Sequence, residues 1–440
     1  MVGTRLMLWL LFGSFAILCL VRVPIAFAML ISSTLAIGAQ GDVPLSIVPQ
    51  RIWVGLNNFP LLAVPFFLFV GQAMNDSGSS ARLVDFARAM VGHLSGGLAH
   101  VNVAVSMIFA GISGVSSADT LGVGSVMIPA MQKEGYPGGF TVAITAASST
   151  LGNVIPPSLM MIIYAATAGL SVGAMFLAGI VPGILIGLGQ MLWASRVASR
   201  LGIGKADTFS GRRLLSAGRS AWPALLIPVI VIGGILAGVF TATEASVVAV
   251  LYVTLLAIAY RQFGLRRWFR LAEEGIGLFS LSLLCVAAAS LWGWILAFYS
   301  VPQAVVGWLG GAGLLASPGS VFFFVILTFL LVGTVMDAIP AIIILQPIVG
   351  EIGAAAGIDP YQMGLVVVLT LAIGLITPPY GLCLLIAADL GRVPAAGAVR
   401  ALFPFYLISL AVVALAVLLP DWVLWIPRAA LPNLMPGALP

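Results

Sequence analysis

Two apolar stretches of this 440-residue chain are interrupted by the same motif. Residues 152–157 read GNVIPP and residues 374–379 read GLITPP, so both have the form G-x-x-x-P-P. Consecutive prolines remove backbone donors and clash with the preceding helical turn, which leaves carbonyl oxygens without helical partners. Within a membrane such a break is tolerated where the backbone lines a cavity or holds an ion. The motif therefore predicts two broken helices whose breaks face a binding site.

Each motif follows a second shared pattern. Residues 116–119 read SSAD and residues 334–337 read TVMD, and a proline follows each aspartate by ten residues, at Pro129 and Pro347. The first proline of the pair comes 37 residues after the aspartate in one copy and 41 in the other. Four features in the same order indicate an internal repeat. Paired segments interrupted by Gly and Pro in two halves of a chain point to the binding site of a secondary transporter.

The composition places the repeat in a membrane. Hydrophobic residues make up 61% of the chain and charged residues 8%, with a mean hydropathy of +1.17, whereas soluble domains have about 25% charged residues. A span needs about 20 apolar residues, so the length allows roughly a dozen spans or part-spans. The net charge of +5 reports membrane orientation and indicates no nucleic-acid partner. No phosphate-loop motif is present, so ATP is not an energy source within this chain.

Two basic clusters, at 196–219 and 261–270, are expected to face the cytoplasm. Two apolar segments separate them, which returns the chain to the same side. Residues 79–94 and 263–277 have the pattern of amphipathic helices at the membrane surface, with solvated loop helices as the alternative. The cysteines, Cys19, Cys285 and Cys383, have no ligand spacing, so no metal site is expected apart from one for a transported ion.

We therefore predict an all-α polytopic membrane protein with two inverted repeats, each consisting of a re-entrant hairpin and a broken transmembrane helix. In the first hairpin, Ser116 or Ser117 is expected to cap the second helix in a capping-box pattern. The predicted divisions are a scaffold with an arm helix at 1–95, a first transport repeat at 96–200 (hairpin 98–132, broken helix 139–168), a loop with scaffold helices and a second arm region at 201–317, a second transport repeat at 318–390 (hairpin 320–350, broken helix 361–388), and a scaffold helix with a tail at 391–440.

Asp119 and Asp337 are ionisable groups at predicted membrane depth, where each costs about 2.5–3.5 kcal/mol on insertion scales. They either only cap hairpin helices or also shape a cation site, and the residues leave both interpretations open. Hydroxyl side chains in such segments more often pack helices than bind ligands. Glu244 is expected to cap a helix after Thr241 or Thr243. No nucleophile–base constellation is visible, so the chain is not expected to be an enzyme.

At these motifs the chain resembles the large, DctM-like permease subunit of tripartite ATP-independent periplasmic (TRAP) transporters. The similarity extends over essentially the whole chain, including VFTATEASVVAV at 239–250. The resemblance implies an elevator-type fold in the bacterial inner membrane, a small four-helix membrane subunit and a periplasmic substrate-binding protein as partners, and import of small organic acids such as C4-dicarboxylates or sialic acids. It also implies Na⁺ as the coupling ion and no other cofactor.

The resemblance further implies two Na⁺ sites, with many ligands being main-chain oxygens. The residues expected at the first site are Ser113, Ser116, Asp119, Gly152, Ile155 and Pro157. Those expected at the second are Thr334, Asp337, Gly374, Thr377 and Pro379. The residues expected to bind the organic acid are Ser117, Thr150, Asn153 and Ser158. The alternatives are a standalone carboxylate carrier driven by Na⁺ or H⁺ and, more remotely, a channel or a membrane-embedded enzyme.

Overall fold

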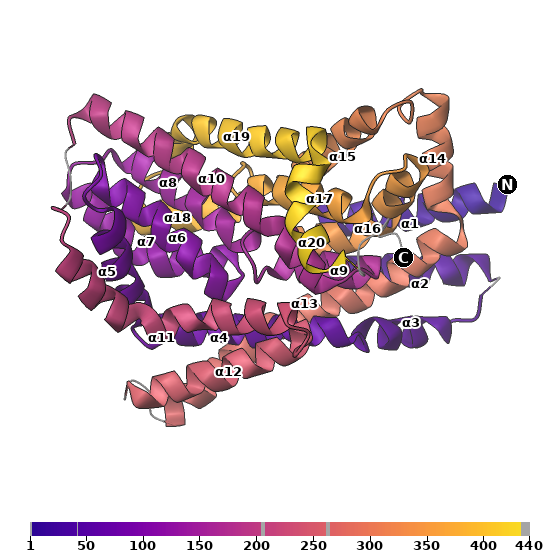
Figure 1. Ribbon diagram of the computed structural model, residues 1–440. Coiled ribbons are helices and arrows are strands. Elements are labelled where there is room, and N and C mark those ends of the chain that lie inside the picture. The colour runs from indigo at the N-terminus through magenta and orange to yellow at the C-terminus, as the bar shows by residue number, and fades with distance from the viewer. Residues whose placement is uncertain (1, 42, 204–206, 261–264, 433–440) are drawn as a thin grey trace.

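The computed structural model describes all residues except 1, 42, 204–206, 261–264 and 433–440. Lys205 and Arg261 of the basic clusters and the end of the predicted tail lie outside the described residues. Within the described part the regular structure is helical (Figure 1). The all-α prediction is therefore confirmed.

The first section of the chain leads up to the first hairpin. Its elements are α1 (Val2–Leu20), α2 (Ile25–Gln40), α3 (Ile47–Leu56), the 3₁₀ turn η1 (Phe59–Leu62), α4 (Ala63–Asp76) and α5 (Ser79–Val91). Helix α5 begins after Gly78, which has a left-handed φ of 68°. Its buried positions include Leu83 and Ala87, four residues apart, so one face of this amphipathic helix is packed inward.

The first repeat contains a helical hairpin followed by an interrupted helix. Its elements are α6 (Gly97–Ser113), α7 (Ser116–Lys133), α8 (Gly138–Ser149), the 3₁₀ turn η2 (Thr150–Asn153), α9 (Leu159–Ala168) and the long α10 (Val172–Leu201). Gly114 ends α6 with φ 66°, a conformation that costs glycine little. The double proline separates η2 from α9, as the G-x-x-x-P-P motif requires.

Four helices connect the repeats: α11 (Gly211–Leu236), α12 (Ala242–Ala259), α13 (Leu265–Phe298) and α14 (Val301–Gly311). A capping box begins α12, in which the Thr241 N–H donates to Glu244 Oε2 at 2.8 Å. The expected capping role of Glu244 is thus confirmed. The amphipathic stretch expected at 263–277 is not a separate surface helix, because its described part continues without a break into the apolar part of α13.

The second repeat has the same order of elements: α15 (Pro318–Gly333), α16 (Ala338–Ala355), α17 (Pro360–Gly374), α18 (Leu382–Gly391) and α19 (Ala395–Leu418), followed by α20 (Pro420–Ala430). The helices of each repeat also pack on helices of the other repeat. Helix α7 of the first hairpin packs on α18 of the second broken helix, and α16 of the second hairpin packs on α9 of the first. In Figure 1 the hairpins accordingly approach each other from opposite ends of the molecule.

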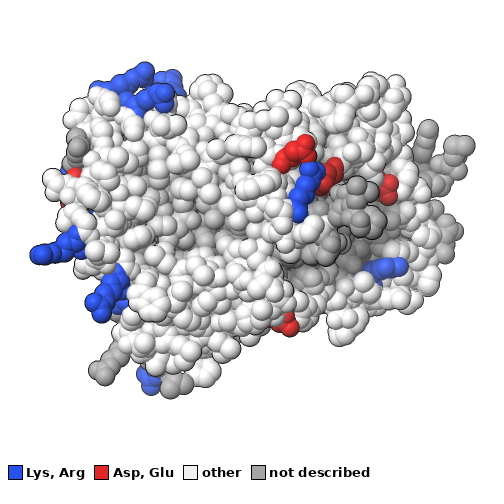
Figure 2. Space-filling model, in the orientation of Figure 1, with Lys and Arg blue, Asp and Glu red and all other residues white. Residues whose placement is uncertain are grey.

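Six described helical runs are long and apolar enough to cross a membrane. They are 59–76, 172–201, 211–236, 242–259, 338–355 and 395–418. The shorter apolar helices of both repeats supply part-spans, although α16 is long and apolar enough to cross the membrane by itself. Lys and Arg side chains gather at the end of the molecule that carries α5 and the beginning of α11 (Figure 2). The positive-inside rule assigns this end to the cytoplasm.

Candidate functional site

The two S/T-x-x-D patterns occupy different helical positions, so the expected capping box is wrong. In the first copy Val115 is the N-cap of α7 and makes no side-chain capping bond. Ser116 is the first residue of the helix. In the second copy Asp337 itself caps α16 by accepting the Ala338 N–H at 2.8 Å. The difference arises because two residues separate the helices of the first hairpin and four separate those of the second.

The glycine that opens each G-x-x-x-P-P motif contacts the hairpin of its own repeat. A Cβ on Gly152 would lie 3.1 Å from the Ser116 nitrogen, and one on Gly374 would lie 2.9 Å from the Gly333 Cα. Both contacts are with backbone atoms, which cannot rotate away. A side chain at either position would therefore push the hairpin tip away from the break.

Hydrogen bonds also join each break to its hairpin tip. The Leu159 N–H donates to the Gly114 carbonyl at 3.1 Å, and the Tyr380 N–H donates to the Thr334 carbonyl at 3.0 Å. In the first repeat the Ser116 N–H also donates to Asn153 Oδ1 at 3.4 Å. The peptide bond between the paired prolines is cis in both copies. Each tip and break thus form one structural unit.

The two units meet at a small cavity of about 60 Å³. This volume has room for about four water-sized groups at about 15 Å³ each. Four of the predicted residues line it: Ser116, Ser117, Asn153 and Asp337. The sequence reasoning missed the other lining residues, which have no motif to reveal them: Val115, Leu159, Met160, Ala338, Ile339, Leu375, Leu382 and Cys383.

Asp119 is fully buried on α7, one helical turn after the lining residue Ser116. The Ser106 and Ser149 side chains face its carboxylate, but neither carboxylate oxygen has a partner within hydrogen-bond geometry, and neither does the Ser116 hydroxyl. Buried acceptors of this kind are costly unless something satisfies them. Oxygen atoms of carboxylate and hydroxyl groups are the ligands of hard cations, so this donor set fits Na⁺.

Several other predicted hydroxyls already bond to nearby backbone. Ser158 caps α9 by accepting the Met161 N–H at 3.3 Å and donates to the Asn153 carbonyl at 2.5 Å. Thr150, Thr334 and Thr377 donate to backbone carbonyls three or four residues earlier in the chain. None of these four lines the cavity between the tips, so their roles in binding stay predictions.

The remaining predicted residues surround the breaks. Ser113 is buried at the end of α6, and its hydroxyl accepts the Val115 N–H at 3.5 Å. The Ile155 N–H donates to the Leu151 carbonyl at 2.8 Å. The Pro157 carbonyl lies so near Gly114 that a Cβ there would be 2.5 Å away. The prediction that these groups and Pro379 bind Na⁺ stays a prediction.

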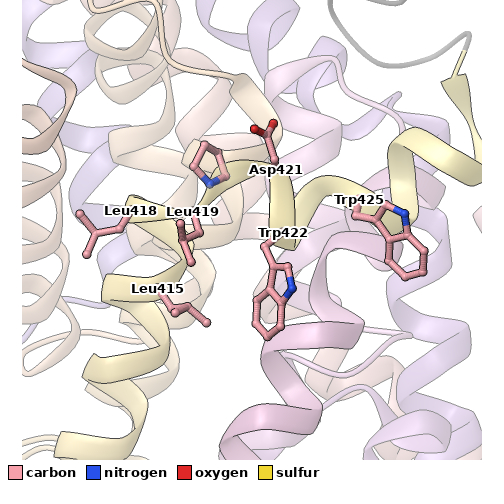
Figure 3. A pocket seen from close by; sticks show the side chains of 7 residues that line it. Leu415, Leu418, Leu419, Asp421, Trp422 and Trp425 are labelled. Atoms are coloured by element: carbon pink, nitrogen blue, oxygen red, sulfur yellow. The ribbon is translucent and has the colours of Figure 1, made fainter.

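A more open groove elsewhere does not have the chemistry of an organic-acid site. It has a volume of about 540 Å³ and lies between the end of α19 and α20, with Leu415, Trp422 and Trp425 along it (Figure 3). Its one charged lining residue, Asp421, is paired with Arg428. Tryptophans of this kind are typical of the membrane–water boundary.

Repeated hairpins, broken helices and apolar spans define the class: a polytopic membrane transporter with a cavity between two repeats. The family model of the tripartite ATP-independent periplasmic transporter, DctM component, matches residues 12–422. The chain therefore belongs to the TRAP large permease family and is a transporter of the inner membrane, not an enzyme. Proteins of this family work in tripartite systems with a small membrane subunit and a periplasmic binding protein.

Individual relatives agree with this assignment, and one solved structure shares the fold. The chain is 38% identical to the C4-dicarboxylate TRAP transporter large permease protein DctM of Pseudomonas aeruginosa, over 83% of this chain and 87% of that protein. It is 32% identical to the sialic acid TRAP transporter large permease protein SiaM of Vibrio cholerae, over 92% and 95%. The Alcanivorax borkumensis YdaH transporter shares the fold, with a TM-score of 0.64 at 15% identity over 87% of this chain and 90% of that one.

Proposed function

We propose that this chain imports a small organic acid across the inner membrane, driven by a Na⁺ gradient. The observation that carries the proposal is a pair of buried groups without hydrogen-bond partners, the Asp119 carboxylate and the Ser116 hydroxyl. Ser116 lines the cavity where the two hairpin tips and the two breaks meet, and Asp119 lies one helical turn further along α7. A buried carboxylate that has no hydrogen-bond partner gains a large interaction with a cation. It would therefore bind Na⁺ and couple its gradient to movement of the tips.

The proposed first Na⁺ site consists of Ser113, Ser116 and Asp119 with main-chain oxygens of Gly152, Ile155 and Pro157. The second consists of Thr334 and Asp337 with main-chain oxygens of Gly374, Thr377 and Pro379. Asp337 lines the shared cavity, so its charge acts on whatever occupies it. The two sites are related by the repeat, although Asp337 is the N-cap of its helix and Asp119 lies inside its helix.

The proposed substrates are organic acids of the classes named for the relatives, C4-dicarboxylate and sialic acid. A substrate carboxylate would approach Ser117 and Asn153 at the cavity between the tips, and the N-terminus of α9 begins beside it. The helix dipole favours an anion there. The helices of both repeats would move as an elevator against the remaining helices.

The proposed partners are a small four-helix membrane subunit and a periplasmic substrate-binding protein, as in the family. The test is uptake of labelled C4-dicarboxylate and sialic acid by proteoliposomes containing this chain and the small subunit. The expected result is uptake that requires both the binding protein and an inward Na⁺ gradient. Uptake without the binding protein would establish a standalone carrier instead, and uptake driven only by a proton gradient would exclude Na⁺ coupling.

A further inference from the structure

A second polar cavity lies between the repeats and the remaining helices. Its volume is about 240 Å³, against about 60 Å³ for the cavity between the tips, and the two share no lining residue. Part of the lining comes from α3, η1 and α13, and the rest from the end of the repeat helix α9 and the middle of the repeat helix α16. The lining residues are Val54, Gly55, Asn58, Leu61, Ala166, Thr167, Val286, Ala289, Ser290, Gly293, Trp294, Ile343, Gln346 and Pro347.

The polar side chains of this cavity are available for a ligand. Among the described residues, the side chains of Asn58, Ser290 and Gln346 form no hydrogen bond, although Gln346 is only 9% exposed. Buried amides and hydroxyls normally find partners. No described lining residue is acidic. A few convergent polar groups on an otherwise apolar wall are typical of small-molecule sites.

A positively charged side chain that is not itself part of the lining contacts one lining residue of the cavity. The Arg51 guanidinium lies over the ring of the lining residue Trp294, 5.1 Å from its centroid. Arg51 Nε is buried and has no hydrogen-bond partner, although the side chain as a whole is half-buried. A guanidinium held on an aromatic face presents its donors in a fixed plane, which suits a carboxylate.

We propose that this cavity is a binding site for the organic acid, in which Arg51 takes a carboxylate and Asn58, Ser290 and Gln346 take its other polar atoms. The inference rests on the proposed function and deepens it. The cavity between the tips has room for an ion and one carboxylate group, whereas the volume of this second cavity is about four times larger. Because the lining belongs to the repeats and to the remaining helices, an acid bound here would contact both at once.

The test measures binding to the purified full-length chain with its small subunit. The probes are a labelled C4-dicarboxylate and its uncharged diamide, and sialic acid is the second acid. We expect the wild type to bind an acid at least tenfold more tightly than the diamide, and Arg51→Gln to remove most of this preference. Arg51→Lys, which keeps the charge without the planar fork, should retain part of it, and Gln346→Leu should weaken acid and diamide alike.

The matched control is Arg82→Gln. Arg82 also stacks on an aromatic ring, 3.5 Å from the Tyr260 centroid, but it lies on α5, at the opposite end of the molecule from α3 (Figure 1). This variant should bind acid as the wild type does. Size-exclusion profiles and melting temperatures of all variants show which ones fold.

A second measurement does not depend on arginine variants. A thiol introduced by Gln346→Cys, in a chain whose native cysteines are replaced by alanine, should be modified more slowly in the presence of the acid and at an unchanged rate with the diamide. Two results would overturn this inference and leave the proposed function standing. One is a labelling rate that the acid does not change. The other is an Arg51→Gln variant that prefers the acid over the diamide as strongly as the wild type does. Failure of the wild type to bind or transport any acid would overturn the proposed function as well.

Discussion

Alanine at Gly152 is expected to weaken cation binding by moving the first hairpin tip. The added Cβ would lie 3.1 Å from the Ser116 nitrogen and the Val115 carbonyl carbon, whereas ordinary contacts begin at 3.4 Å. The tip must therefore move by at least about 0.3 Å. Overpacking of this kind costs roughly 1–3 kcal/mol, offset by up to about 1 kcal/mol from the lost flexibility of glycine. A net cost near 1.4 kcal/mol corresponds to a factor of about ten in binding.

The assay is the Na⁺ dependence of acid uptake in proteoliposomes, with the melting temperature of the purified protein measured in parallel. Gly152→Ala should raise the half-saturating Na⁺ concentration about tenfold. Gly233→Ala is the control, because it adds the same methyl group within α11, where a Cβ meets nothing within 4 Å. If Gly152→Ala changes neither quantity relative to Gly233→Ala, the contact between break and tip does not position the site, and the reasoning is refuted.

Three further predictions concern separate features. Asp119→Asn keeps the shape of the buried carboxylate but removes its charge, so the half-saturating Na⁺ concentration should rise at least tenfold, since contacts with charged groups are worth about 1.5–3 kcal/mol; an unchanged value would exclude Asp119 as a ligand. Burial alone would raise the pKa of Asp207, but hydrogen bonds and charges from Arg88 and Arg213 lower it overall. The stability that ionised Asp207 gives to the fold is therefore fully present above the ordinary aspartate pKa of about 3.9. It is lost as the pH falls through the lower pKa that Asp207 has in the folded state. Arg88→Ala should reduce the melting temperature at pH 7, by an amount equivalent to at most about 1 kcal/mol because the pair is partly exposed, and the difference from the wild type should shrink below pH 4. Thr241→Ala removes the N-cap of α12 and should cost about 1 kcal/mol in thermal unfolding, with a neutral effect counting against the capping box.

The sequence predicted the structure correctly where the chemistry of a residue restricts the backbone around it. Two consecutive prolines cannot continue a helix, so both breaks could be placed within a few residues. The capping role of Glu244 followed for the same reason, since its side chain can reach a backbone N–H three residues back. The hydropathy and the basic clusters in turn predicted a membrane protein and its orientation.

Packing between distant segments could not be predicted. Nothing in SSAD or TVMD reveals that two residues join the helices of one hairpin and four join those of the other, and this difference moves Asp337 to an N-cap while Asp119 stays unpartnered inside a helix. The reason for glycine in each G-x-x-x-P-P motif was equally hidden, because it depends on contact with a hairpin more than 30 residues earlier.

Each hairpin packs on the broken helix of the other repeat, and this packing would link the two proposed cation sites. The packing consists of the pairs α7–α18 and α9–α16, so neither tip can move without moving the second half of the opposite break. Residues of both tips also line one cavity. A cation that draws the first tip onto its break therefore changes the geometry that the second cation meets. By thermodynamic linkage the second cation must affect binding of the first by the same factor. Because uptake under the proposed function requires both cations, the uptake rate should depend on Na⁺ with a Hill coefficient above one.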